Sequence, residues 1–242
     1  MSEGSRIVRL RAFEAGVEPY DWPFAQGRAA DIEAHWRGLK ARKPGLFDGR
    51  VLLQREGGLD TDGVYRGRWF EAAYSAFLAW RDLGFPDPGV RNGFAMAALR
   101  AADGAFLLGR MAAGTESAGR AYFPCGTPDP SDVTPDGRLD LAGSALRELA
   151  EETGIAPQEL IVGEGWTAVF EGARIACMRD VRLPLPAKEA RALILERIAG
   201  QPEPELDDIV VVRSMDDVDP GRMPLFMRIF LAQAFETAPA QR

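Results

Sequence analysis

Three acidic side chains close together in the sequence are the residues best suited to carry chemistry. Glu148, Glu151 and Glu152 lie in the stretch RELAEETGI, residues 147–155. On a helix, successive residues are roughly 100° apart, so these spacings bring the three carboxylates onto one face. Apolar side chains gather on the opposite face. The stretch therefore predicts an amphipathic helix with an acidic edge, and Gly154 supplies its stop.

Such an acidic edge is unfavourable unless a cation neutralises it. Like charges three or four residues apart on a helix repel by roughly 0.2 to 0.5 kcal/mol per pair. Hard divalent ions such as Mg²⁺ prefer oxygen ligands and often lie between carboxylates and the phosphates of a substrate. A divalent-cation site and a merely solvated acidic face are the two interpretations.

The complete pattern favours the cation site because it resembles the second half of the Nudix box. Residues 147–155 supply Arg-Glu, an apolar residue, any residue, Glu-Glu, any residue, Gly and an apolar residue. The resemblance implies the catalytic helix of a pyrophosphate hydrolase. It makes Glu148, Glu151 and Glu152 the ligands of Mg²⁺ or Mn²⁺, and Arg147 the residue that orients a glutamate through an ion pair.

The first half of the box departs from the family pattern. The usual Gly and Glu positions hold Val133 and Leu139. Gly126, in Phe-Pro-Cys-Gly, is a better match to the family's glycine, and the loop after it is then about seven residues longer than usual, with turn formers along it. Asp140 is the acid nearest to the missing Glu, where it can hold Arg147 or cap the helix.

The resemblance implies a reaction in which metal-activated water attacks a phosphoanhydride. A carboxylate that is not fully committed to metal must accept the proton of that water. The candidates are Glu151 and Glu205, which precedes an apolar run at residues 209–212 where related enzymes often place an acid. Glu205 can equally be a solvated loop charge.

The substrate is less well defined than the reaction. Arg110 and Arg120 can reach phosphate oxygens, and Phe170 can stack on a base, although aromatic strand residues are usually core. The partial match of residues 106–126 to coenzyme A diphosphatases has Thr115 in place of an Arg and Cys125 in place of a Gly. We expect a nucleoside diphosphate linked to another moiety. Coenzyme A hydrolysis and a non-catalytic ligand sensor remain alternatives.

Composition indicates a cytoplasmic enzyme. The chain has 242 residues, 46% of them hydrophobic, which permits a sizeable core. A net charge of −7 argues against nonspecific binding to nucleic acid or acidic membranes. Two cysteines are too few for a disulfide scaffold, and neither a signal peptide nor a membrane-length apolar run is found. The single histidine, His35, is remote from the acidic cluster, so no histidine mechanism is expected. A homodimer is possible, as is common in the resembled family.

Periodicity and turn formers divide the chain near residue 90. Residues 1–90 are expected to form an α+β extension packed on the core, and residues 91–242 the Nudix domain, an α/β/α sandwich with a mixed sheet. The extension is predicted to contain strands at 6–11 and 51–55 and helices at 29–41 and 69–83. The domain is predicted to contain strands at 95–100, 105–110, 120–124, 165–170, 174–178 and 209–212, and helices at the acidic stretch, 188–199 and 225–235.

Overall fold

The computed structural model describes residues 4–237, which form two compact units. The described part of the larger unit consists of residues 4–11, 94–126 and 142–237, and the smaller unit consists of residues 12–93 and 127–141. The units therefore alternate along the chain, which differs from a single division near residue 90. No helix among residues 4–237 is long and apolar enough to cross a membrane.

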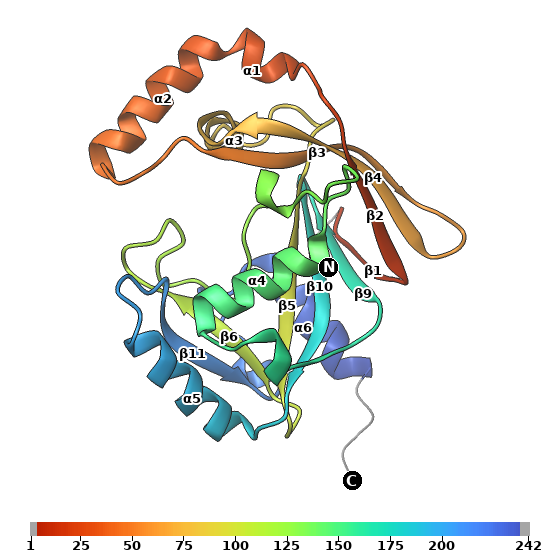
Figure 1. Ribbon diagram of the computed structural model, residues 1–242, viewed down its shortest axis with the longest axis vertical. Helices are drawn as coiled ribbons and strands as arrows, with labels where there is room; N and C mark the ends of the chain where they lie inside the picture. Colours follow the sequence, from red (N-terminus) through yellow and green to blue (C-terminus); the bar gives the residue numbers. More distant parts are fainter. Residues whose placement is uncertain (1–3, 238–242) are drawn as a thin grey trace. The chain divides into compact units, whose positions relative to one another are not determined.

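An eight-stranded sheet forms the centre of the larger unit (Figure 1). Its main strand order is β1-β9-β10-β5-β6-β11, with β7 paired to β6 and β8 paired to β10. The strands are β1 (Arg6–Leu10), β5 (Asn92–Ala101), β6 (Phe106–Met111), β7 (Ala121–Tyr122), β8 (Ile161–Val162), β9 (Trp166–Glu171), β10 (Arg174–Leu183) and β11 (Leu206–Val212). The helices are α4 (Leu141–Thr153), α5 (Ala187–Ala199) and α6 (Leu225–Thr237), and short 3₁₀ turns occupy Pro157–Glu159 and Met215–Asp217.

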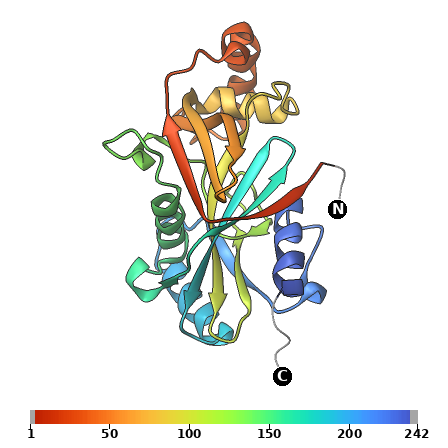
Figure 2. The same cartoon turned by 90° about the vertical axis from the view of Figure 1, so that its right-hand side faces the viewer.

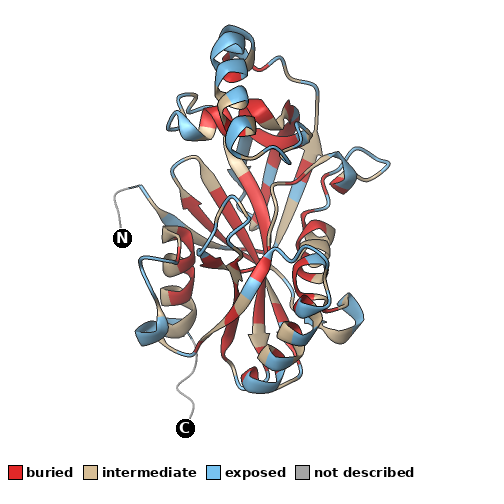
Figure 3. Ribbon diagram, turned by 90° about the vertical axis from the view of Figure 1, so that its left-hand side faces the viewer, coloured by how far each residue is buried: buried red, intermediate tan, exposed pale blue. Residues whose placement is uncertain are grey.

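Helices cover both faces of this sheet, because alternate residues of its strands are apolar on both sides. Met96 and Ala98 of β5 pack with Phe230 of α6, whereas their neighbours Ala97 and Leu99 pack on the other face in a cluster with α4 and α5. In Figure 2, α4 and α6 lie on opposite sides of the strands. The strands are largely buried, and the outer helix surfaces are exposed (Figure 3). The expected α/β class with a mixed sheet is confirmed.

Most of the elements predicted for this unit are present, and the acidic helix ends as expected. Gly154 follows α4 with φ of 71°, and its N–H donates to the carbonyl of Ala150 at 2.8 Å. A left-handed residue after the last turn is the usual helix stop and costs glycine nothing. The strand expected at 120–124 is shorter, since only Ala121 and Tyr122 pair with β6.

Strand β1 belongs to the large sheet rather than to an N-terminal extension. It pairs antiparallel with β9, with Arg6 opposite Phe170 and Leu10 opposite Trp166. The alternation of charged and apolar residues predicts this strand correctly. Local sequence holds no information on a partner some 160 residues away, which explains why the pairing was not foreseen.

The smaller unit has a three-stranded sheet of order β2-β4-β3. Its elements are β2 (Ala12–Val17), α1 (Pro23–Gly27), α2 (Ala29–Arg42), β3 (Arg50–Leu59), β4 (Val64–Ala73), α3 (Tyr74–Asp82) and a 3₁₀ turn at Pro130–Asp132. Its core is aromatic: Trp22 lies 5.6 Å from Phe70 and 5.9 Å from Trp80 between ring centroids. Edge-to-face contacts of this kind add to the burial of apolar area.

The helix predicted at 69–83 is wrong in its first third. Residues 69–73 belong to β4 and pair antiparallel with β3, with Gln54 opposite Trp69 and Arg50 opposite Ala73. Only Tyr74–Asp82 is helical. A short apolar run has no clear period of its own, so strand pairing decided the conformation of its first residues.

The long loop before α4 is ordered by the smaller unit. Leu139 N–H donates to Ala15 O at 2.8 Å, Val17 N–H to Gly137 O at 3.1 Å, and Leu52 N–H to Pro128 O at 2.6 Å. The turn formers of this loop therefore serve backbone pairing with β2 and β3. The extra residues have a structural function in this unit.

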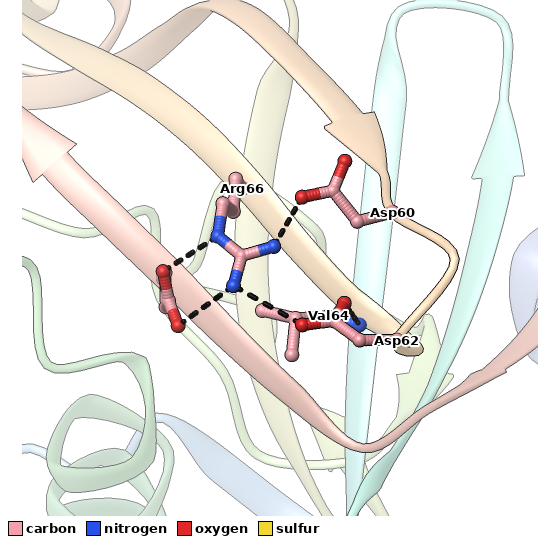
Figure 4. A network of polar contacts seen from close by, with 5 residues as sticks. Asp60, Asp62, Val64 and Arg66 are labelled. Atoms are coloured by element: carbon pink, nitrogen blue, oxygen red, sulfur yellow. Dashed lines mark hydrogen bonds and ion pairs between the residues drawn. The ribbon is translucent and has the colours of Figure 1, made fainter.

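A charged cluster ties together the ends of strands in the same sheet (Figure 4). Arg66 of β4 bonds to both carboxylate oxygens of Glu14 on β2, at 2.7 and 3.2 Å, and also to Asp60 and Asp62 in the turn between β3 and β4. These three carboxylates raise the pKa of the Arg66 guanidinium. A bidentate pair adds a directional contact between the two strands that carry it, where Glu14 lies opposite Arg66 in the register.

Candidate active site

The acidic edge of α4 shows a gradient of exposure. The Glu152 residue is 4% exposed, the Glu148 side chain 17% and the Glu151 side chain 59%. A buried carboxylate is costly unless its oxygens have partners. The gradient therefore distinguishes two inner carboxylates from one that faces solvent.

Glu152 is held from the loop that precedes the long insertion. Its Oε1 accepts a hydrogen bond of 3.0 Å from the backbone N–H of Cys125. Its Oε2 is buried and has no hydrogen-bond partner. A buried oxygen with no partner is rare in folded proteins and calls for an explanation, such as an ion.

Burial raises the pKa of the Glu152 carboxyl well above its usual value, and the bond from Cys125 opposes this shift. The charges of Glu148, Glu205 and Glu151 raise it further. Carboxylates that raise each other's pKa lie close enough to repel. Glu205, which comes from a different part of the chain, therefore lies within electrostatic reach of the acidic helix.

Glu148 lies directly against Gly126. A Cβ built on Gly126 would stand 2.5 Å from Oε1 and 2.7 Å from Cδ of Glu148, which is closer than real Cβ contacts come. Only glycine leaves room for the carboxylate in this position. The glycine identified from the sequence therefore makes a close approach to the acidic edge.

Arg147 forms two ion pairs on the acidic edge. Its Nη1 lies 3.1 Å from Glu148 Oε1 and 3.0 Å from Glu151 Oε2. Within residues 4–237, no three His, Cys, Asp or Glu side chains are arranged as a set of metal ligands. Glu148 and Glu151 point toward Arg147 instead, and the positive charge of its guanidinium partly offsets the repulsion between them.

Glu205 immediately precedes β11 and is exposed. Its carbonyl accepts a 2.8 Å hydrogen bond from Ala112 N–H, just after β6. Its charge also raises the pKa of Tyr122 and of Cys125, after the larger effect of burial. Burial and the charges of Glu152, Glu148 and Glu205 raise the pKa of the Cys125 thiol, which disfavours its thiolate form.

Of the three residues expected to bind substrate, Arg110 and Phe170 contact other side chains and Arg120 is exposed. Arg110 bonds to Asp207 at 2.6 Å and lies 3.4 Å from Asp208, so two carboxylates already compensate its charge. Phe170 is 4% exposed, with the guanidinium carbon of Arg6 4.2 Å above its ring. Arg120 is exposed beside β7. Asp208 lies opposite Arg110 in the β6–β11 register, and Asp207 lies at the irregularity just before it. The two consecutive acids are the only trace of this ion pair in the sequence.

A clamp that the sequence did not reveal fixes the end of the acidic helix. Arg197 of α5 donates to both carboxylate oxygens of Glu159, at 2.7 and 2.8 Å, and to the carbonyl of Gly154 at 2.8 Å. Glu159 also accepts from Ala156 N–H at 2.8 Å. Bidentate pairing of this kind is strong and directional. It lowers the pKa of Glu159 to about 2.

Replacing Arg197 with Gln is expected to lower the free energy of unfolding by about 1 to 2 kcal/mol near neutral pH, because the pair is about one-third exposed. Because the pKa of Glu159 is lower in the folded than in the unfolded chain, its ion pair stabilises the fold fully at pH values above 4.5. That stability is lost as the pH falls from 4.5 toward about 2. The difference from wild type should therefore shrink in urea unfolding at lower pH. Arg222→Gln, at an exposed pair, is the control. A pH-independent difference would contradict the clamp.

Comparison with known proteins gives structural likeness only. No family model and no curated protein matches the sequence. A MutT protein from Methanosarcina mazei Go1 is 20% identical, with a TM-score of 0.38 over 60% of this chain and 95% of its own. The Nudix hydrolase RenU from M. smegmatis is 18% identical, with a TM-score of 0.37 over 62% of this chain and 88% of its own. An Ap4A hydrolase from C. elegans is 15% identical, with a TM-score of 0.37 over 60% of this chain and 94% of its own. Likeness at this level is no evidence of function, which must come from the residues of the chain itself.

Proposed function

We propose that the chain is a Nudix hydrolase that uses Mg²⁺ or Mn²⁺ to cleave the pyrophosphate bond of a nucleoside diphosphate linked to another moiety. The observation that carries this proposal is Glu152, whose Oε2 is buried without a partner beside two further glutamates. A chain gains nothing in stability from such an oxygen. A divalent cation bound there would provide the missing partner for this oxygen and offset the repulsion between the glutamates.

Glu148, Glu151 and Glu152 are the residues that would hold the cation. Their oxygens are hard ligands, which suit Mg²⁺ and Mn²⁺. When bound, such an ion neutralises phosphate charge and makes a coordinated water more acidic. The fit rests on the unpartnered oxygen of Glu152 and on the space that Gly126 leaves around Glu148.

The remaining steps fall to side chains of the chain itself. The Cys125 N–H holds Glu152 in one orientation, and Arg147 holds Glu148 and Glu151. Glu151 is the most exposed of the three and can accept a proton and release it to solvent. Glu205, whose charge raises the pKa of Glu152, is the second candidate for that role. With either residue as the proton acceptor, Glu152 would remain available to bind the cation.

A substrate panel tests the proposal. The purified chain is incubated with ADP-ribose, NADH, nucleotide sugars, coenzyme A and nucleoside triphosphates, with Mg²⁺, with Mn²⁺ or with EDTA. We expect one class of diphosphate to be cleaved in the presence of metal and none in EDTA. Tight binding of a panel member without turnover would instead support the ligand sensor. Turnover in EDTA would contradict the role of the glutamates.

A further inference from the structure

A polar cavity lies in the larger unit, on the face of the sheet that α6 covers. Its volume is about 400 Å³, within the range of small-ligand pockets. Strand residues Arg9, Arg100, Thr167 and Arg182 line it together with Gln233 of α6, and Phe230 of α6 adds apolar surface. Arg9 and Thr167 are direct partners in the β1–β9 register.

The cavity is cationic on an acidic chain. Three arginines face two carboxylates, Asp180 and Glu164, among its lining residues. The net charge of this group is therefore +1 (3 − 2), against −7 for the whole chain. Like-charged guanidiniums gather only where something offsets their repulsion.

Arg100 carries the strongest sign of an absent partner. Its Nε is buried and has no hydrogen-bond partner, while its guanidinium carbon lies 4.3 Å above the Phe106 ring. Burial lowers the pKa of Arg100, Asp180 partly offsets this, and Arg182 and Arg9 lower it further. The other two arginines are only loosely engaged, Arg9 with Thr167 at 3.4 Å and Arg182 with Asp180 at 3.5 Å.

This cavity is distinct from the acidic site. Arg100 pairs with Phe106 at the start of β6, whereas Glu205 is bonded to Ala112 just after the end of that strand. Six residues of extended chain separate the two by about 20 Å. The cavity also includes Phe230 of α6, whereas α4 packs on the opposite face.

We propose that this cavity binds a small phosphate monoester, with its phosphate oxygens on Arg9, Arg100 and Arg182 and its apolar part against Phe230. Arginine suits phosphate because its planar fork donates two parallel hydrogen bonds. A phosphate monoester carries about −1.5 to −2 charges at neutral pH, which offsets the positive charge that Asp180 and Glu164 leave uncompensated.

The test uses Glu152→Gln protein in EDTA, so that no metal-dependent binding at the acidic site contributes. Phenyl phosphate, inorganic phosphate and benzoate are titrated separately, and the affinity and stoichiometry of each are measured by isothermal titration calorimetry. We expect phenyl phosphate to bind with one-to-one stoichiometry and at least ten times more tightly than benzoate.

Matched variants locate the binding. The double replacement Arg9→Gln with Arg182→Gln changes exposed side chains and is expected to weaken phenyl phosphate binding at least tenfold. Arg213→Gln, an exposed arginine paired with Asp103, should leave binding unchanged. Absence of binding at 10 mM, equal affinity for benzoate, or no effect of the double variant would each overturn the proposal. None of these outcomes bears on hydrolysis, so the two proposals fail separately.

Discussion

Glu152→Gln is expected to abolish metal-dependent hydrolysis, lowering kcat by on the order of 10³-fold or more, or about 4 kcal/mol of barrier. Gln has the same size and can still accept the hydrogen bond from Cys125 N–H. It lacks the negative charge through which a carboxylate attracts a divalent ion, so it binds the ion more weakly. Initial rates on the substrate found in the panel measure the effect. Glu189→Gln, the same replacement on the exposed surface of α5, should leave the rate unchanged.

The fold of this variant should survive. Burial raises the pKa of Glu152, so it disfavours the ionised form of this carboxyl in metal-free protein. Removing that charge should leave Tm in EDTA at least as high as in wild type. Mg²⁺ should raise Tm of the wild type and not of the variant, because only binding to the folded state stabilises it. Wild-type turnover in the variant would refute the role of Glu152.

Gly126→Ala should have the second-largest effect. The added methyl group would meet the Glu148 carboxylate at 2.5 Å, so the carboxylate must move by about 1 Å to restore ordinary contact. Misplacement on this scale can cost about 10²-fold in rate. We expect a ten- to hundredfold loss of kcat with the fold retained, because the end of a flexible side chain can shift without disturbing the core.

A matched glycine separates this effect from a general loss of flexibility. Gly114 lies in the same unit, and a Cβ placed there meets nothing within 4 Å. Gly114→Ala should therefore keep full activity. Circular dichroism and thermal unfolding check that both variants fold. Equal activity of the two variants would mean that the position of Glu148 does not matter for the reaction.

The acidic helix was predictable from sequence because all of its information is local. Its period, its glycine stop and its charge pattern lie within a few turns of chain. The hydrogen bond that holds Glu152 comes from a backbone N–H at Cys125, and a backbone group leaves no trace in residue identity. The engagement of Arg110 with Asp207 likewise depends on the register of two strands far apart in sequence.

The same limit explains the errors in the fold. Residues 69–73 became strand because β3 was available to pair with them, which helical periodicity cannot report. Residues 127–141 looked like an elongated loop of the catalytic region, and their hydrogen bonds to β2 and β3 were invisible in the sequence. The division near residue 90 assumed that the units follow each other along the chain.

The interleaving of the two units sets an order for synthesis on the ribosome. Strand β1 emerges about 160 residues before its partner β9. The smaller unit likewise lacks its last backbone partners until residues 127–141 have been made. Contacts of such high sequence separation close late and slow folding. Neither unit can finish folding before more than half of the chain has been made. During a long part of synthesis, β1 therefore stays unpaired with β9.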